Sequence, residues 1–365
     1  MKLNFRSLAE DAPADALRQV FSHGWPGWSD WMRKRHTIGA TDLRDARLAL
    51  RRHMPEFETL WDKWVETCGD DDDIALFLSF WSPPRYLVNC SQAVIVDADG
   101  PQLIRNYDLD PKLNESTLLS TKWRGRRVVG MVEGMVGLAD GMNDAGLVAS
   151  LTFGGRVVSA AGFGIPMIIR YVLEMCVDVQ QAVEALRSVP CHMSYNVTVA
   201  DVSGAWATVF LAPDRPAIVT HSPFATNHQI GVEWSRHGRF SNTQGRADHL
   251  EELFRDPTMT ADRLLGEFLT SPLASTGYDR GFGTVYTAVY RPLARSVSLV
   301  WMDGTRDEWQ LDAVDRRERM VHFSAAGSRS VAYRSAKSLK TDSAAPAQGR
   351  PDLPGSGHQH SHSNC

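Results

Sequence analysis

The 365-residue chain lacks three features that would place it in a specialised class of protein. It has no apolar run approaching the roughly 20 residues that a transmembrane helix needs. Residues 1–7 contain none of the apolar stretch of a secretory signal. The net charge is only −4, so the chain carries no overall basic character of the kind that attracts nucleic acid or anionic membranes. We therefore expect a cytoplasmic protein without nucleic-acid or membrane partners.

Cysteine is scarce and irregularly spaced. An odd number of thiols without a Cys-x-x-Cys pair argues against both a disulfide framework and a zinc ribbon. Three histidines near the C-terminus, at positions 358, 360 and 362, are read as part of a solvated tail. The sequence thus predicts no resident metal or cofactor. The cysteines are Cys68, Cys90, Cys176, Cys191 and Cys365.

The hydrophobic pattern divides the chain into three parts. Residues 1–89 have helical spacing, which Pro83-Pro84 interrupts. Residues 90–325 have mainly β-strand patterning with a block of helices, which favours α+β layers over alternating β-α-β units. Residues 326–365 are rich in Ser, Ala, Pro and Gly, which predicts a disordered tail. Helices are expected at 14–21, 40–52, 55–68, 74–81, 166–174, 178–186 and 260–270, with Asp178 and Thr260 as the N-caps of the last two. Strands are expected at 91–97, 102–108, 125–132, 135–139, 146–152, 194–200, 205–211, 216–220, 284–290 and 295–301.

Three tryptophans, Trp25, Trp28 and Trp31, recur at near-helical spacing. This pattern predicts an aromatic cluster that packs in a core or an interface. The alternative is that the same rings form the wall of a substrate pocket.

Cys90 begins the segment with the clearest chemical potential. The turn sequence at 97–101, with Asp-Gly at its centre, predicts a hairpin. Folding the segment about residue 99 places Cys90 roughly opposite Asp108, with Arg105 near the same strand end. Such a polar setting suits thiol chemistry, because a thiolate or a base-activated thiol is the nucleophile. The alternatives are that Cys90 is a buried structural thiol and that Arg105 and Asp108 form a surface ion pair.

The order of motifs along the chain resembles a known family. Cys90, followed by the turn at 97–100 and by Arg105-Asn106-Tyr107-Asp108, looks like the opening of the catalytic domain in the choloylglycine hydrolase superfamily. The similarity is greater to its acyl-coenzyme A:6-aminopenicillanic acid acyltransferase-like branch, whose members are N-terminal-nucleophile enzymes. The resemblance extends over about residues 50–305. Further motifs in the family order are Gly141 to Leu147, Gly164-Ile165-Pro166, Ala200 to Gly204, Ala225-Thr226-Asn227-His228, Ser235 to Arg239 and Thr284-Val285-Tyr286-Thr287.

The resemblance implies an αββα sandwich, the N-terminal-nucleophile hydrolase fold, over residues 90–325, preceded by a helical pro-segment at 1–89. It also implies autoproteolysis between Asn89 and Cys90, with the two segments remaining associated as a heterodimer. Cleavage would give Cys90 a free α-amine with a pKa of about 8, which can accept the thiol proton near neutral pH.

The resemblance also implies roles for individual residues. Arg105 and Asp108 would hold the amine and thiol of Cys90, and Asn227 would donate its side-chain amide to the oxyanion. Thr152 would supply a second contact through its backbone N–H. Asn143 and Arg239 are weaker candidates for positioning, and Asn143 is equally well read as a turn residue before Gly146.

The implied activity is hydrolysis or transfer of an acyl group from a linear amide through a Cys90 acyl-enzyme. An acyl-coenzyme A is an alternative acyl donor. Two rival readings remain. One is an unprocessed Cys-His hydrolase with His228 or His221 as the base. The other is a catalytically silent relative that acts as a binding protein.

Overall fold

The computed structural model describes residues 1–35, 42–325 and 327–332. The C-terminal histidines and most of the expected tail lie outside these residues. The tail boundary at 326 is corrected by a final strand, β16 (Gly327–Ala332), which pairs antiparallel with β15 (Glu318–Ser324). Backbone pairing, rather than the apolar periodicity on which the boundary was placed, holds this short edge strand in the sheet.

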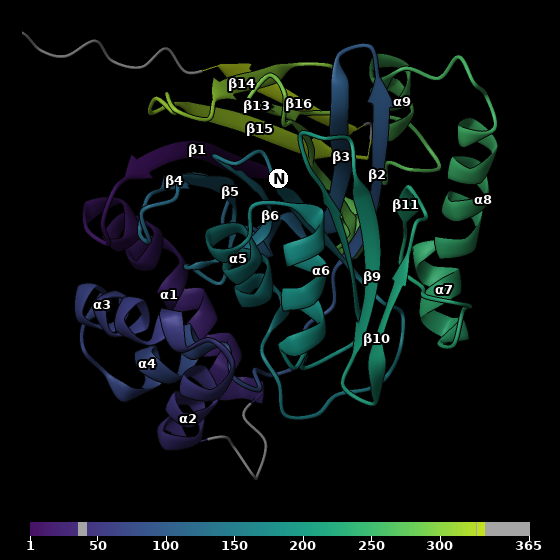
Figure 1. The fold of residues 1–365 in the computed structure, drawn as a ribbon. Helices are drawn as coiled ribbons and strands as arrows, with labels where there is room; N and C mark the ends of the chain where they lie inside the picture. The colour runs from purple at the N-terminus through teal and green to yellow at the C-terminus, as the bar shows by residue number, and fades with distance from the viewer. Residues whose placement is uncertain (36–41, 326, 333–365) are drawn as a thin grey trace, which may run out of the picture. The chain divides into compact units, whose positions relative to one another are not determined.

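Within the described residues the strands form two sheets, one of ten strands and one of six (Figure 1). Side chains of the two sheets interlock, because the amide group of Gln92 hydrogen-bonds to the hydroxyls of Ser150 and Thr198. In spatial order, the ten-stranded sheet comprises β10 (Arg215–Thr220), β9 (Trp206–Ala212), β8 (Tyr195–Ala200), β7 (Val148–Phe153), β6 (Gly137–Asn143), β5 (Val128–Glu133), β4 (Thr117–Thr121), β1 (Lys2–Glu10), β15 and β16. The six-stranded sheet comprises β11 (Phe224–Ala225), β2 (Asn89–Asp97), β3 (Gly100–Leu109), β12 (Gly283–Arg291), β13 (Ser296–Val300) and β14 (Arg306–Gln310).

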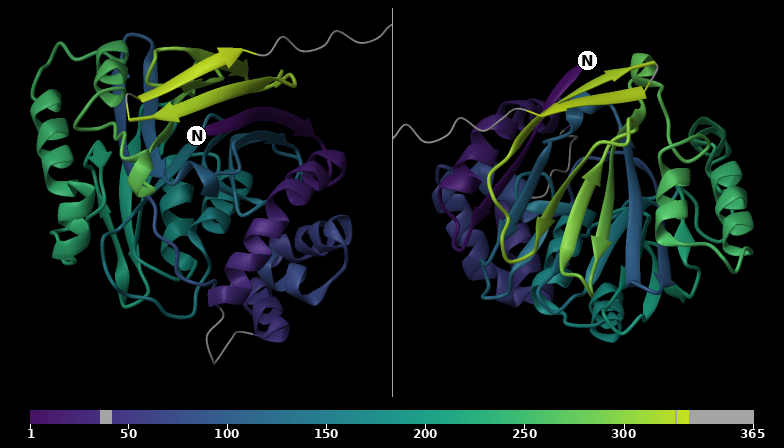
Figure 2. Two further views of the ribbon diagram at one scale, coloured as in Figure 1. Left: turned by 180° about the vertical axis from the view of Figure 1, so that it is seen from behind. Right: turned by 90° about the horizontal axis from the view of Figure 1, so that it is seen from above.

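Helices cover the outer face of each sheet. α5 (Ile165–Met175) and α6 (Val179–Ser188) pack on the ten-stranded sheet, whereas α8 (Thr243–Phe254) and α9 (Ala261–Phe268) pack on the six-stranded sheet, after the short helix α7 (Ser235–Ser241) (Figures 1 and 2). The fold is therefore the predicted αββα sandwich.

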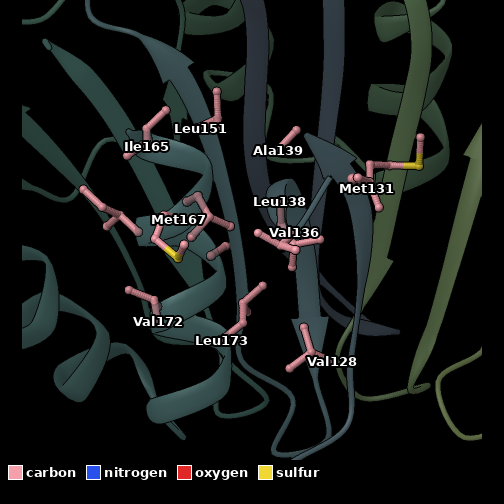
Figure 3. Packing of buried hydrophobic residues seen from close by; sticks show 14 of the residues in the cluster. Val128, Met131, Val136, Leu138, Ala139, Leu151, Ile165, Met167, Val172 and Leu173 are labelled. Atoms are coloured by element: carbon pink, nitrogen blue, oxygen red, sulfur yellow. The ribbon is translucent and has the colours of Figure 1, made fainter. Parts of the chain in front are cut away.

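The helix α5 shows why the larger sheet is covered. Pro166 lies in its first turn, and Ile165, Met167, Val172 and Leu173 are fully buried against the sheet (Figure 3). Facing residues from the β5–β7 region, including Leu138 and Leu151, complete the layer. Sequence-predicted caps also hold in the neighbouring helices, since Asp178 caps α6 and Thr260 caps α9 through their side-chain oxygens.

The N-terminal segment, residues 1–89, is not wholly helical as the sequence pattern suggested. Its helices are α1 (Asp15–Arg35), α2 (Leu43–His53), α3 (Glu58–Cys68) and α4 (Asp72–Ser79), but it begins with the strand β1. β1 runs parallel to β4 and antiparallel to β15, and so completes the ten-stranded sheet. Long-range pairing overrides the weak local signal there. The described residues also contain the short 3₁₀ turns η1 (Pro55–Phe57), η2 (Pro111–Leu113) and η3 (Tyr278–Arg280).

Candidate active site

The hairpin of β2 and β3 forms as predicted, but its register differs by one residue from the expected one. Asp97 pairs with Gly100, so the turn contains only Ala98 and Asp99. Cys90 is consequently opposite Tyr107, and Asn89 is opposite Asp108. Because neighbouring residues of a strand point to opposite faces, Cys90 and Asp108 lie on different faces of the hairpin. The expectation that they share a face is therefore wrong.

The inner face of the hairpin carries Cys90 and Arg105 toward the ten-stranded sheet. Arg105 is completely buried, and its Nη2 lies 2.9 Å from the Cys90 Sγ. The guanidinium also lies over the ring of Tyr107, 4.5 Å from the ring centroid. Arg105 is opposite Gln92, and Gln92 shares a face with Cys90, so Arg105 and the thiol lie on the same face of the hairpin. The expected proximity of Arg105 to Cys90 is therefore observed.

Asp140, on β6, holds Arg105 in this position. Its Oδ2 accepts from Arg105 Nη1 at 2.5 Å and from the Tyr286 hydroxyl at 2.8 Å, and its Oδ1 accepts from the Tyr290 hydroxyl. The backbone carbonyl of Leu151 accepts from the second guanidinium nitrogen. Sequence analysis missed Asp140, although it directly precedes the Gly141 motif. A buried arginine with an aspartate and carbonyl partners is the paired arrangement that a desolvated charge requires.

The outer face of the hairpin carries Asp108 toward Arg246 of α8. The two charged groups approach to 3.9 Å, and Asp108 Oδ1 also accepts from the Thr284 hydroxyl at 2.7 Å. Burial raises the pKa of Asp108 to about 6, against the lowering effects of Arg246, of the Thr284 hydrogen bond and of Arg105. Asp108 thus faces a second buried cation instead of the thiol.

Arg246 connects this outer face to the backbone of Cys90. Its Nη1 donates to the Cys90 carbonyl at 2.6 Å and to the Ser91 hydroxyl at 2.8 Å, and its Nη2 donates to Asn227 Oδ1 at 2.6 Å. Sequence analysis did not select Arg246. The only available signal was a single arginine in a helix that had not been predicted.

Asn227 lies directly beside the backbone of Cys90. Its Oδ1 accepts from the Cys90 N–H at 3.2 Å, and its Nδ2 donates to the Phe153 carbonyl at 3.2 Å. Two donors converge on Oδ1, which determines how the amide is oriented. Thr152 supports this segment, because its hydroxyl donates to the Thr226 carbonyl at 2.8 Å.

The other two sequence candidates lie apart from this cluster. All four side-chain hydrogen bonds of Asn143 stay in its own turn or go to the Leu173 and Cys176 carbonyls at the end of α5. This is the turn role that the sequence left open. Arg239 is exposed on α7, and no hydrogen bond joins its side chain to the cluster in the described part of the chain.

The Cys90 thiol lies in a fully enclosed environment. Cys90 is completely buried, and burial raises the pKa of its thiol to about 12, despite the opposing effect of Arg105. A thiol of that pKa is almost entirely protonated near neutral pH. Arg105 and Asn227 are therefore in contact with a buried cysteine, the first at its thiol and the second at its backbone nitrogen.

Two cavities flank the segment that leads to Cys90. The first, which we call the mouth pocket, has a volume of about 440 Å³. The second is an aromatic cavity of about 480 Å³ whose wall includes Trp28 and Trp31, with ring centroids 5.4 Å apart. The tryptophan cluster therefore packs internally and also lines a cavity. The mouth pocket is lined by Leu87, Asn89, Asp108, Leu109, Asp110, Leu113, Trp234, Arg236, His237, Phe240, Gly281 and Phe282.

Comparison with known proteins identifies the family. Residues 96–306 match the family model described as acyl-coenzyme A:6-aminopenicillanic acid acyl-transferase. The chain belongs to this family. The match covers more than half of the chain and confirms the family suggested by the motifs. Membership places the chain in a family described by acyl transfer.

Solved structures of three other proteins are similar to this chain at low identity. The conjugated bile acid hydrolase of Clostridium perfringens is 14% identical over 63% of this chain and 96% of its own, with a TM-score of 0.46. The penicillin V acylase of Agrobacterium tumefaciens is 14% identical over 63% of this chain and 90% of its own, with a TM-score of 0.36. The Caenorhabditis elegans orthologue of N-acylethanolamine-hydrolyzing acid amidase is 18% identical over 56% of this chain and 93% of its own, with a TM-score of 0.36.

Two searches gave negative results. No curated protein matches the chain. Across the residues that the structure describes, none of the helices has the length and apolar character needed to cross a membrane.

Proposed function

We propose that this chain is an autoproteolytic cysteine enzyme that hydrolyses or transfers acyl groups from linear amides, with Cys90 as an N-terminal nucleophile. The observation that carries the proposal is the pair of contacts on Cys90. Arg105 approaches the thiol at 2.9 Å, while Asn227 accepts from the backbone nitrogen that would become the free amine. Both atoms that an N-terminal nucleophile uses are therefore already held by polar side chains.

The first step of the proposal is self-cleavage. The Cys90 Sγ attacks the carbonyl carbon of Asn89, the bond from that carbon to the Cys90 nitrogen breaks, and the thiol proton passes to the nitrogen. Water then hydrolyses the resulting thioester, which releases the Asn89 carboxylate and restores the thiol. Arg246 and Asn227 hold the carbonyl and nitrogen of Cys90, which limits the movement of the nucleophile during attack.

The second step is turnover of substrate. The new α-amine of Cys90 accepts the thiol proton, and Sγ attacks the acyl carbonyl of the substrate. The amine portion of the substrate then takes that proton and leaves, which gives the acyl-enzyme. Water or an acceptor amine then takes the acyl group, and an acyl-coenzyme A thioester is an alternative donor. In this proposal Asn227 Nδ2 donates a hydrogen bond to the oxyanion, while Arg105 stabilises negative charge on sulfur.

The two segments are proposed to remain associated after cleavage. Strand β1 of the N-terminal segment pairs on one side with β4 and on the other with β15, both of which lie in the C-terminal segment. Removing β1 would expose two rows of backbone hydrogen-bonding groups inside the ten-stranded sheet. This arrangement supports a stable heterodimer.

The geometry gives less support to the rival Cys-His mechanism. Among the described residues no histidine is hydrogen-bonded to Cys90. His228 instead contacts the hydroxyls of Thr243 and Thr226, and His221 is exposed.

Intact-mass spectrometry and N-terminal sequencing of the purified protein test the proposal. We expect two fragments, one of which begins at Cys90, and a Cys90→Ala variant that remains one chain. A wild-type protein that turns over acyl amides while it stays full length would favour the Cys-His alternative. A full-length protein without activity, and with no acylation of Cys90 by an electrophilic acyl analogue, would favour the binding-protein alternative.

A further inference from the structure

The mouth pocket contains an unusual histidine. His237 is only 6% exposed, yet neither of its ring nitrogens has a hydrogen-bond partner among the described residues. Its ring stacks on Trp234 at 5.1 Å and meets Phe153 edge-on at 5.0 Å. The ring is therefore held in one orientation by aromatic packing while its polar atoms remain unsatisfied.

A second unsatisfied polar group lies in the same pocket. The Oδ1 of Asn89 is buried and also lacks a hydrogen-bond partner among the described residues. Buried polar atoms without partners destabilise a fold, and native proteins contain few of them. The mouth pocket thus contains two unpaired polar groups, the imidazole ring of His237 and the side-chain amide oxygen of Asn89.

The position of Asn89 identifies which part of a substrate would enter the pocket. In self-cleavage the Asn89 residue is the acyl group of the first thioester, so its side chain occupies the space that the acyl group of a later substrate would take. The Asn89 side chain is an uncharged amide separated from the acyl carbon by two carbons. Phe240 and Phe282, with ring centroids 5.1 Å apart, form an apolar wall of the same cavity.

We propose that His237 determines acyl specificity by hydrogen-bonding to an uncharged amide or hydroxyl group close to the acyl carbonyl of the substrate. This inference rests on the proposed function, and it adds the chemical class of the acyl group. A neutral imidazole offers one donor and one acceptor, which matches an amide or a hydroxyl. Burial lowers the pKa of His237 to about 4, so the ring is neutral under ordinary conditions.

The test uses two p-nitroanilides that differ only in this polar group. One carries a 3-carbamoylpropanoyl group, and the other carries its apolar isostere, 4-methylpentanoyl. Wild-type enzyme should prefer the carbamoyl substrate in kcat/KM, and His237→Phe should reduce that preference tenfold or more, while kcat on the apolar substrate is retained. His237→Gln should keep part of the preference because its amide also donates and accepts.

Stability and a matched control separate recognition from packing. His237→Phe should unfold at the same temperature as wild type or higher, because it removes an unsatisfied polar group from an aromatic environment. His192→Phe is the control, since His192 is also buried and has an unpartnered Nε2 but does not line the mouth pocket. An unchanged substrate preference in His237→Phe, or an equal loss on both substrates with a lower unfolding temperature, would overturn the inference.

A separate measurement covers failure of the proposed function. If wild type releases nitroaniline from neither substrate, the amide-hydrolase proposal fails on these donors, and the pocket is judged by binding alone. Calorimetric titration with butanediamide and with 4-methylpentanamide then replaces turnover. Tighter binding of butanediamide to wild type than to His237→Phe supports the inference, and equal binding contradicts it.

Discussion

Each face of the β2–β3 hairpin contributes one residue to a buried arginine–aspartate pair, and the two pairs contact different atoms of Cys90. On the inner face, Arg105 Nη1 and Asp140 Oδ2 are 2.5 Å apart, and the arginine contacts the Cys90 thiol. On the outer face, Arg246 Nη1 and Asp108 Oδ2 are 3.9 Å apart, and the arginine contacts the backbone carbonyl of Cys90. The inner pair is therefore suited to charge on sulfur, and the outer pair to the position of the peptide. A single cysteine is thus constrained from both faces of one hairpin.

The largest expected effect comes from breaking the inner pair. Arg105→Ala leaves Asp140 buried without its cation, which typically destabilises a protein by about 3–5 kcal/mol. We expect complete loss of processing, measured by intact mass, together with a large fall in unfolding temperature. The double variant Arg105→Met with Asp140→Asn should restore much of the stability without restoring processing. Processing by the double variant would show that Arg105 serves only the fold.

Asn227 joins the two faces, and its loss should have the next largest effect. Asn227→Ala should lower kcat by about 100-fold to 1,000-fold, the usual loss for one oxyanion donor, with little change in KM. Steady-state kinetics on a panel of acyl amides and thioesters measures this effect. Raised KM with unchanged kcat would mean that Asn227 only binds substrate. Covalent labelling by an electrophilic acyl analogue should still occur at Cys90, and labelling at Cys68, Cys176 or Cys191 would contradict the assignment of the nucleophile.

The outer pair should show a smaller effect. Asp108→Asn keeps the size of the side chain and its hydrogen bond with Thr284, but removes the charge that faces Arg246. We expect processing or turnover to fall by about tenfold to 100-fold, because the attraction between the Asp108 carboxylate and the Arg246 guanidinium, 3.9 Å apart, is lost. Time courses of cleavage, followed by gel or mass, measure the effect. A variant that cleaves at the wild-type rate would show that only the inner face matters.

The smallest expected effect is on stability as a function of pH. Burial raises the pKa of Asp108 to about 6, and the pKa of Glu133, beside Tyr107, to about 8. In each case the folded protein binds the proton more tightly than the unfolded chain, so stability is highest below the unfolded pKa and falls as pH rises through the folded value. We expect the unfolding temperature to decrease by roughly a few degrees between pH 5 and pH 8.

Matched variants assign that pH dependence to one face or the other. Glu133→Gln should flatten the profile between pH 5 and 8, whereas Asp108→Asn should flatten it only between about pH 4 and 6. Scanning calorimetry of wild type and both variants in the same buffers measures the difference. Parallel profiles in all three proteins would mean that neither carboxyl group contributes.

Local sequence determined the parts of this protein that depend on short-range physics. The Asp-Gly turn and the alternating strands predict the hairpin, Asp178 and Thr260 predict helix caps, and the ordered motifs identify the family. Each signal is local because turn geometry, capping and alternation involve only a few consecutive residues. The proximity of Cys90 and Arg105 follows from that hairpin.

Tertiary structure alone decided the remaining parts. A two-residue turn moved the register by one position and separated Cys90 from Asp108, a difference too small for residue patterns to resolve. Asp140 and Arg246 reach Cys90 from β6 and α8, distant in sequence, because the two sheets and the outer helices pack around the hairpin. The sequence therefore determined the nucleophile and its hairpin, whereas long-range packing selected the charges that surround it.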